Sequence, residues 1–145
     1  MKLCLLTGAL IFAAQCIFAQ ANCDNRKLAV LGDFGSVDFV IELADEPAER
    51  TRGLMQRRGM DVSAGMLFVF DQPKAVTFWM KNTLIPLDII WIDRNKRIVS
   101  IMRDILPCKT QQCPAYTPKQ SALYVLEVNS GVTIEQGIKV GDQAI

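Results

Sequence analysis

The sequence contains no histidine among its 145 residues. Without imidazole, a Ser-His-Asp or Cys-His nucleophile system is impossible, and so is any metal site that depends on histidine ligands. A basic block is missing as well, because 16 Lys and Arg stand against 15 Asp and Glu, for a formal net charge of +1. A nearly neutral domain has no long-range field to attract nucleic acid or an anionic membrane surface. We therefore expect no nucleic-acid partner, no metal site and no cofactor.

The chain is too short for two domains, and its first 21 residues have the pattern of a secretory signal peptide. Lys2 supplies the positive start, residues 3–14 are mostly apolar, and Ala19-Gln20-Ala21 is a small-x-small cleavage pattern. An apolar run of about 12 residues is too short to cross a bilayer of roughly 30 Å as a helix. We predict a signal peptide over 1–21 and one globular domain over 22–145, exported to the periplasm or secreted and not inserted in a membrane after signal removal.

Cysteine is scarce, and two of the five lie in the predicted signal peptide. Cys108 and Cys113 stand five positions apart in a loop rich in Pro, Gln, Lys and Thr. In an oxidising compartment this spacing predicts a structural disulfide that removes conformational freedom from a long connection. A redox-active pair is the alternative, although redox motifs favour two intervening residues at a helix start rather than four in a Pro-flanked loop. Cys23 has no evident partner.

Short strands joined by turns dominate the expected secondary structure. Period-2 alternation is clearest over residues 36–44, where apolar side chains occupy every second position. A parallel doubly wound fold would need a helix between most strands, and such helices are missing. We expect three hairpins followed by two further strands: 27–31 with 36–44, 65–70 with 75–80, 87–92 with 97–103, then 123–128 and 142–145.

Two short helices interrupt these strands. Asp45 is a candidate N-cap for a helix from residue 46 to about residue 57, and Ser130 is one for a helix over 132–136. Gly53 lies inside the first predicted helix, where glycine is about 1 kcal/mol less favourable than alanine, so we expect close packing on the sheet to require it. The predicted fold is mainly β (α+β): a compact antiparallel barrel-like domain of short strands and hairpins with two short helices.

Chemistry-bearing side chains concentrate in residues 78–88, which place an ammonium, an amide, a hydroxyl and a carboxylate in an apolar context. Asp88 is the least expected, because four apolar residues follow it and a buried carboxylate needs donors or stays protonated. Glu127 has a similar setting between Leu126 and Val128. In a small barrel these groups can converge on one pocket, whose predicted members are Arg52, Trp79, Lys81, Asn82, Asp88 and Glu127.

Two interpretations of Asp88 stay open. In the first, Asp88 accepts backbone N–H groups of the 82–85 loop and pairs with Lys81, which makes it a structural residue. In the second, the same groups line a ligand or catalytic pocket, and both situations perturb the pKa of a carboxyl. Trp79 alternates out of phase with its neighbours, so it either is exposed and binds a ring or sugar face, or covers the barrel.

Longer motifs resemble a known family. They are Pro47-Ala48-Glu49-Arg50-Thr51-Arg52-Gly53-Leu54-Met55, Gly65-Met66-Leu67-Phe68-Val69-Phe70, Phe78-Trp79-Met80-Lys81-Asn82-Thr83 and Tyr124-Val125-Leu126-Glu127-Val128-Asn129. Over about residues 27–145 the chain resembles the uncharacterised bacterial and archaeal family known as domain of unknown function 192. The resemblance implies a mostly antiparallel, barrel-like β domain with short helices, often exported, and it brings no established activity and no catalytic residues.

Three functions are consistent with these observations. The first is a binding module for a small polar or sugar-like envelope ligand, favoured by the lack of histidine, of a free nucleophile and of a metal cluster. The second is a hydrolase or lyase with Asp88 and Glu127 as acid and base and Lys81 or Arg52 as electrostatic stabiliser, which requires both carboxyls to face one cleft. The third is an envelope interaction domain without a pocket, which requires a broad exposed apolar patch.

Overall fold

The computed structural model describes residues 26–145. The predicted signal peptide over 1–21 and Cys23 lie outside these residues. Within the described part, no helix combines the length and the apolar character needed to cross a membrane.

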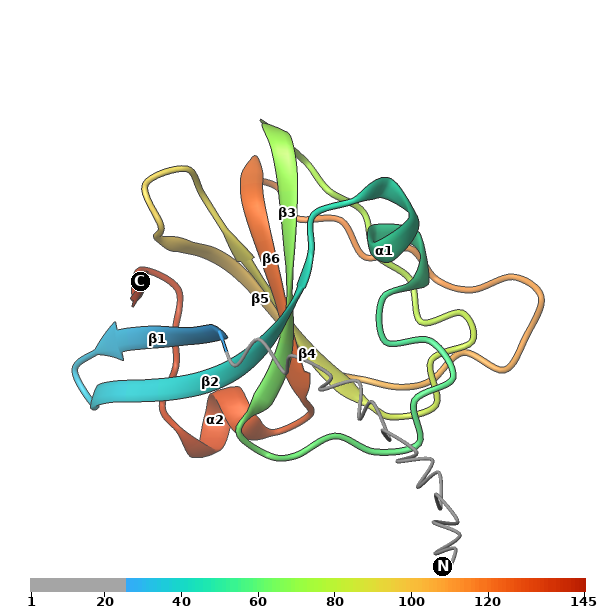
Figure 1. The fold of residues 1–145 in the computed structure, drawn as a ribbon, viewed down its shortest axis with the longest axis horizontal. Helices are drawn as coiled ribbons and strands as arrows, with labels where there is room; N and C mark the ends of the chain where they lie inside the picture. Colours follow the sequence, from blue (N-terminus) through green and yellow to red (C-terminus); the bar gives the residue numbers. More distant parts are fainter. Residues whose placement is uncertain (1–25) are drawn as a thin grey trace, which may run out of the picture.

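Seven strands and two short helices make up residues 26–145 (Figure 1). In chain order they are β1 (Arg26–Gly32), β2 (Gly35–Ala44), α1 (Pro47–Arg52), β3 (Ala64–Lys74), β4 (Leu87–Ile92), β5 (Ile98–Ile105), β6 (Ala122–Asn129), α2 (Val132–Glu135) and β7 (Gln143–Ala144). The strands form one sheet in the order β5-β4-β6-β3-β2-β1-β7. The β2–β3 pair is parallel, and the other neighbouring pairs are antiparallel.

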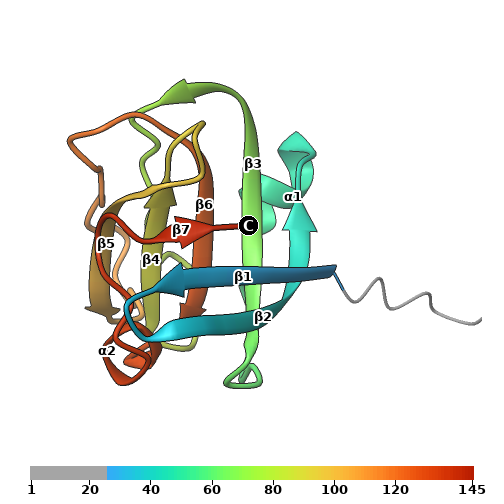
Figure 2. The ribbon, with the colours of Figure 1, turned by 90° about the vertical axis from the view of Figure 1, so that its left-hand side faces the viewer.

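The sheet curls into a half-barrel. Figure 2 shows β1 and β2 running across the direction of β3, β6 and β4. The two edges of the sheet meet at one end, because Arg97 forms a bridge with Gln143 and the Ile98 N–H donates to the Asp142 carbonyl at 2.9 Å. The predicted mainly β, barrel-like fold with two short helices is therefore confirmed.

Both faces of the central strands are buried, which explains why all six residues of β4 are inaccessible to solvent. Successive side chains of a strand point to opposite faces. Ile90 and Ile92 therefore pack on the inner face of the curl, whereas Ile89 and Trp91 pack on the outer face. The inner face is closed by β1, β2 and α2. The outer face is covered by α1 and by the three long connections 53–63, 75–86 and 106–121, which gather on the right-hand side of Figure 1.

The connection 75–86 differs from the prediction. Its first residues were expected to form a hairpin with 65–70, but β3 continues to Lys74 and pairs with β2 and β6 instead. The backbone of Phe78 bonds to Tyr116 in the connection 106–121, at 2.9 Å and 2.8 Å. Val76 and Met80 are buried against the outer face, and the Trp91 indole donates to the Val76 carbonyl at 2.9 Å. The alternation of this segment thus reflects burial on the sheet and not membership of it.

The helix α1 is shorter than predicted, because Gly53 ends it. Gly53 has φ +47, and its N–H donates to the Glu49 carbonyl at 2.8 Å. A Cβ at this position would lie 3.2 Å from Cζ of Phe68, so close packing on the sheet adds to the need for glycine. The N-cap is Glu46 and not Asp45, and the Glu49 carboxylate accepts the Glu46 N–H at 3.1 Å.

The helix α2 begins at Val132, as predicted, but its N-cap is Gly131 and not Ser130. Gly131 has φ +88. The Ser130 hydroxyl is turned toward β5 and donates to the Asp104 carboxylate at 2.8 Å. Ser130 therefore ties the end of β6 to β5 instead of capping the helix.

Candidate functional site

Two adjoining cavities lie on the outer face, under α1 and the long connections. The Glu127 cavity has a volume of about 40 Å³ and the Lys81 cavity one of about 690 Å³. Thr83 lines both cavities, so they meet at that residue. The Glu127 cavity is lined by Arg50, Thr51, Arg52, Gly53, Leu54, Met55, Phe68, Phe78, Trp79, Thr83 and Glu127. The Lys81 cavity is lined by Gln56, Lys81, Asn82, Thr83, Leu84, Pro107, Cys108, Lys109, Thr110 and Gln111.

Five of the six predicted site residues come together in these cavities. Arg52 at the end of α1, Trp79 and Glu127 line the first cavity. Lys81 and Asn82 line the second. The convergence depends on the connection 75–86, which crosses the outer face and carries Trp79, Lys81 and Asn82 to the end of α1.

Asp88 is the sixth residue, and the structure places it on the inner face. In the β4–β6 register, Asp88 pairs with Val128 and Ile89 pairs with Glu127. Because directly paired residues share a face of the sheet, Asp88 and Glu127 point to opposite sides. The two carboxyls therefore face no common cleft, which removes the geometric basis of the acid–base pair.

Asp88 is fully buried and saturated with hydrogen bonds. One carboxylate oxygen accepts the Asp104 N–H at 2.9 Å, and the other accepts the N–H and the hydroxyl of Thr133 at 3.1 Å and 2.6 Å. The partners expected for a structural Asp88, namely the 82–85 loop and Lys81, were wrong. Asp88 instead ties β4 to the end of β5 and to α2, which is a structural role with different partners.

Glu127 is buried without such support. Its side chain is 5% exposed, and no group of residues 26–145 donates a hydrogen bond to its carboxyl. Burial raises the pKa of Glu127 to about 8, and loss of water is the sole cause of that shift. At neutral pH the carboxyl is therefore mostly protonated, and in this form it both donates and accepts hydrogen bonds toward the cavity.

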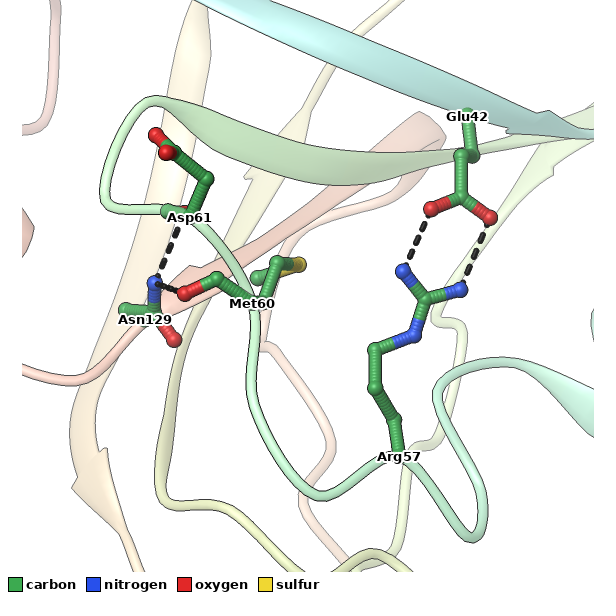
Figure 3. Close-up of polar contacts among 5 residues, drawn as sticks. All are labelled: Glu42, Arg57, Met60, Asp61 and Asn129. Atoms are coloured by element: carbon green, nitrogen blue, oxygen red, sulfur yellow. Dashed lines mark hydrogen bonds and ion pairs between the residues drawn. The ribbon is translucent and has the colours of Figure 1, made fainter.

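The connection 53–63 forms one wall of the site and is anchored at two points (Figure 3). The Arg57 guanidinium pairs with both oxygens of the Glu42 carboxylate on β2, and this pairing lowers the pKa of Glu42. The Asn129 amide, at the end of β6, donates to the carbonyls of Met60 and Asp61 at 3.0 Å and 2.9 Å. These contacts fix the connection relative to the sheet just after the residues that line the cavities.

A backbone contact joins two walls of the Lys81 cavity. Gln56 and Asn82 both have positive φ, +61 and +58, which side-chain-bearing residues rarely adopt. The Gln56 N–H donates to the Asn82 carbonyl at 2.8 Å. Uncommon backbone conformations of this kind cluster at functional sites, where the surrounding structure holds them in place.

Trp79 is 51% exposed at the rim, which is the exposure that the ring-binding alternative requires. The Lys81 ammonium lies 5.3 Å from the centre of the Trp79 ring, within cation–π distance. The indole therefore offers a partly open ring face beside a positive charge, at the edge of the Glu127 cavity.

The predicted disulfide between Cys108 and Cys113 is present. The Cys108 N–H donates to the Met80 carbonyl at 3.2 Å, and Cys108 forms a parallel bridge with Lys81. The closed loop is thereby held against the connection 75–86 and forms a wall of the Lys81 cavity.

Thr83, Lys109 and Gln56 are among the lining residues that were not predicted from the sequence. Thr83 lies within the chemistry-rich stretch and is buried where the cavities meet. Lys109 lies inside the disulfide loop, so the loop closure was the signal for it. Gln56 follows the first helix and carried no signal of its own. Among the described residues, no three His, Cys, Asp or Glu side chains are grouped to hold a metal ion.

Comparison with known proteins gives relatives by sequence and solved structures of the same fold. The chain is 28% identical over 102 residues to a UPF0127 protein of Thermococcus gammatolerans, which is 70% of this chain and 63% of that one. It is 26% identical over 102 residues to UPF0127 protein TK1120 of Thermococcus kodakarensis, 70% of this chain and 61% of that one. The match thus spans less than two thirds of these curated relatives.

Solved structures are more similar still. A protein of unknown function from Novosphingobium aromaticivorans is 36% identical with a TM-score of 0.77, over 82% of this chain and 83% of that one. A candidate transcription regulator from Sinorhizobium meliloti 1021 is 33% identical with a TM-score of 0.75, over 82% and 91%. The profile of the family DUF192, described as Uncharacterized ACR, matches residues 30–145. The chain therefore belongs to the DUF192 family.

Proposed function

We propose that the protein is an exported binding module that recognises a small polar, sugar-like ligand in the two cavities of the outer face. The observation that carries the proposal is the Glu127 carboxyl, which is 5% exposed and has no hydrogen-bond donor within the described residues. Its oxygens stay accessible only through the Glu127 cavity, and a desolvated carboxyl that faces a cavity without a protein donor is typical of functional sites. A ligand that enters the cavity supplies the missing partner.

The volumes of the cavities indicate how such a ligand lies. The Glu127 cavity, at about 40 Å³, exceeds the roughly 10–15 Å³ that one water needs and has room for a single polar substituent such as a hydroxymethyl group. The Lys81 cavity, at about 690 Å³, is within the range of roughly 300–1,000 Å³ typical of small-molecule sites. The body of the ligand therefore occupies the Lys81 cavity, and one substituent reaches Glu127 past Thr83.

The side chains match a ligand with several hydroxyl groups and one apolar face. The protonated Glu127 carboxyl both donates to and accepts from a hydroxyl. Asn82 adds an amide with both capacities, and the Arg52 guanidinium adds donors only. The partly exposed ring of Trp79 provides an apolar surface for the face of a sugar.

Export rests on the sequence. Residues 1–21 have the signal-peptide pattern, and the Cys108–Cys113 disulfide is typical of proteins in oxidising compartments. The periplasm or the external medium is therefore the compartment in which the ligand is to be sought.

Two other functions are less well supported. A hydrolase with paired carboxyls needs Asp88 and Glu127 in one cleft, and they lie on opposite faces of the sheet. Regulation of transcription, suggested by the name of the Sinorhizobium relative, is not favoured by the balanced charge of this chain.

A thermal-shift titration of the exported protein tests the proposal. Binding to the folded state adds stability by mass action, about 2.7 kcal/mol at a ligand concentration 100 times Kd, so a sugar that binds raises Tm. Trp79→Ala should abolish the rise and leave Tm of the free protein unchanged. Ile134→Ala is the matched control, because Ile134 is an exposed apolar residue on α2 and lines neither cavity. The proposal fails if no sugar of a broad panel raises Tm, or if both variants weaken binding equally.

A further inference from the structure

The two cavities differ in charge, and this difference narrows the class of ligand. The residues lining the Lys81 cavity include two lysines, Lys81 and Lys109, and no aspartate or glutamate. The remaining lining is mostly amide and hydroxyl side chains, namely Gln56, Asn82, Thr83, Thr110 and Gln111. Such a surface attracts a negative charge and offers hydrogen bonds around it.

The two ammonium groups are available for a ligand. The Lys81 ammonium lies over the face of Trp79, 5.3 Å from the ring centre, and this cation–π contact leaves its N–H groups available as hydrogen-bond donors. The ion pairs of the described residues join Arg57 to Glu42 and Lys139 to Asp33, and neither includes Lys81 or Lys109. Two cations that share one cavity without a carboxylate repel each other, and an anion between them removes this repulsion.

Resting on the proposed function, we infer that the ligand is an anionic sugar: a saccharide that carries a carboxylate or a phosphate. The anionic group occupies the Lys81 cavity, where lysines bind either anion as point charges. The sugar ring extends from the Lys81 cavity toward Trp79, whose ring the Lys81 ammonium contacts, and a hydroxyl reaches Glu127 through the junction at Thr83. The neutral, protonated Glu127 carboxyl fits this arrangement, because an ionised carboxylate beside the ligand would repel it.

Matched pairs of sugars separate this inference from the proposed function. Isothermal titration calorimetry of the exported protein at pH 7 and low salt compares D-glucose with D-glucuronate and with D-glucose 6-phosphate, and D-galactose with D-galacturonate. We expect at least one anionic member to bind about tenfold or more tightly than its neutral partner, since hydrogen bonds to a charged group are stronger than those between neutral groups. The preferred member then identifies the anion as carboxylate or phosphate. Raising the salt concentration to 0.3 M should reduce the preference.

Lysine variants locate the anion. Lys109→Met and Lys81→Met should each reduce affinity for the anionic sugar about tenfold and reduce affinity for the neutral partner by a clearly smaller factor. Lys119→Met is the matched control, because Lys119 lies with Lys109 in the connection 106–121 but lines neither cavity. It should change neither affinity. Equal binding of neutral and anionic sugars, or an equal effect of Lys119→Met, overturns the inference while the proposed function stands. Absence of binding by every sugar overturns both.

Discussion

Asp88 and Glu127 are buried carboxyls on neighbouring strands of one sheet, and the protein treats them in opposite ways. Asp88 accepts three hydrogen bonds on the inner face, from Asp104 and from Thr133. Glu127 accepts none from the described residues on the outer face, and burial raises its pKa to about 8. The inner face is closed by packed strands and α2, whereas the outer face is covered by long connections that leave cavities.

The difference teaches how a structural carboxyl is distinguished from a functional one. A buried carboxylate with donors on both oxygens holds elements together, because removing it leaves those donors unpaired. A buried carboxyl without donors contributes nothing to the fold and lowers stability when it ionises. The two residues have almost the same sequence context, so the distinction comes from their partners alone.

Substituting Asp88 should produce the largest loss of stability. In Asp88→Asn one carboxylate oxygen becomes an NH₂ group that faces an N–H donor, and the charge-assisted hydrogen bonds are lost. We expect the free energy of unfolding to fall by about 3 kcal/mol. Urea unfolding at pH 7 measures this change.

Asp104→Asn is the control for this substitution. The Asp104 carboxylate is exposed and accepts one hydroxyl, from Ser130, so the loss should stay below about 1 kcal/mol. Equal losses in the two variants would show that the three hydrogen bonds of Asp88 do not distinguish it from an exposed carboxylate.

Substituting Glu127 should have the opposite sign and should depend on pH. Between pH 4.5 and about 8 the folded protein keeps a proton on Glu127 that the unfolded chain has released. The stability of the parent protein therefore falls as pH rises through this window, by at most about 1.4 kcal/mol per pH unit from this group. Glu127→Gln cannot ionise, so its stability relative to the parent should increase by about 3–4 kcal/mol from pH 5 to pH 8.

Urea unfolding of both proteins at pH 5, 6.5 and 8 tests this expectation. Glu135→Gln serves as a second reference, because Glu135 is exposed to solvent on α2. A difference between Glu127→Gln and the parent that stays constant with pH would mean that Glu127 is ionised in the folded state, and the comparison with Asp88 would then lose its basis.

Much of this arrangement follows from local sequence. The continuous apolar run after Asp88 indicates a strand buried on both faces, and the polar groups of residues 78–83 indicate a site in an apolar setting. Five of the six predicted site residues line the cavities because three of them belong to one short connection and the other two lie on elements that pack against it.

The face occupied by Asp88 could not be predicted from the sequence. Which residues share a face depends on the β4–β6 register. In the sequence, these two strands are separated by β5 and by the connection 106–121. A shift of one residue would have placed Asp88 beside the cavities. The same limit explains the wrong hairpin, since β3 pairs with β2 across α1 and with β6, and local alternation contains no information on distant partners.

Reducing the Cys108–Cys113 disulfide should affect the outer face alone. The bond closes a short loop, so chain entropy predicts a loss of about 2 kcal/mol in the free energy of unfolding. Because Cys108 lines the Lys81 cavity, reduction should also weaken sugar binding. The double variant Cys108→Ala/Cys113→Ala, compared with the parent by urea unfolding, separates loss of the bond from effects of the reductant. Free thiols in exported material, detected by mass spectrometry without reductant, would contradict the structural role.

Trp79→Ala should have the smallest effect on stability and the most selective effect on binding. Trp79 is half exposed at the rim, and its side chain makes a cation–π contact with Lys81. The free energy of unfolding should therefore change by no more than about 0.5 kcal/mol. Trp91→Phe is the contrasting variant, since Trp91 is fully buried and its indole donates to the Val76 carbonyl. Loss of that hydrogen bond and of packing should lower stability by about 2 kcal/mol. Urea unfolding and sugar titration of both variants test these two roles. A Trp79→Ala protein that binds sugar normally would show that the indole is not part of the binding site, and the sugar would lose its support as the ligand of Glu127.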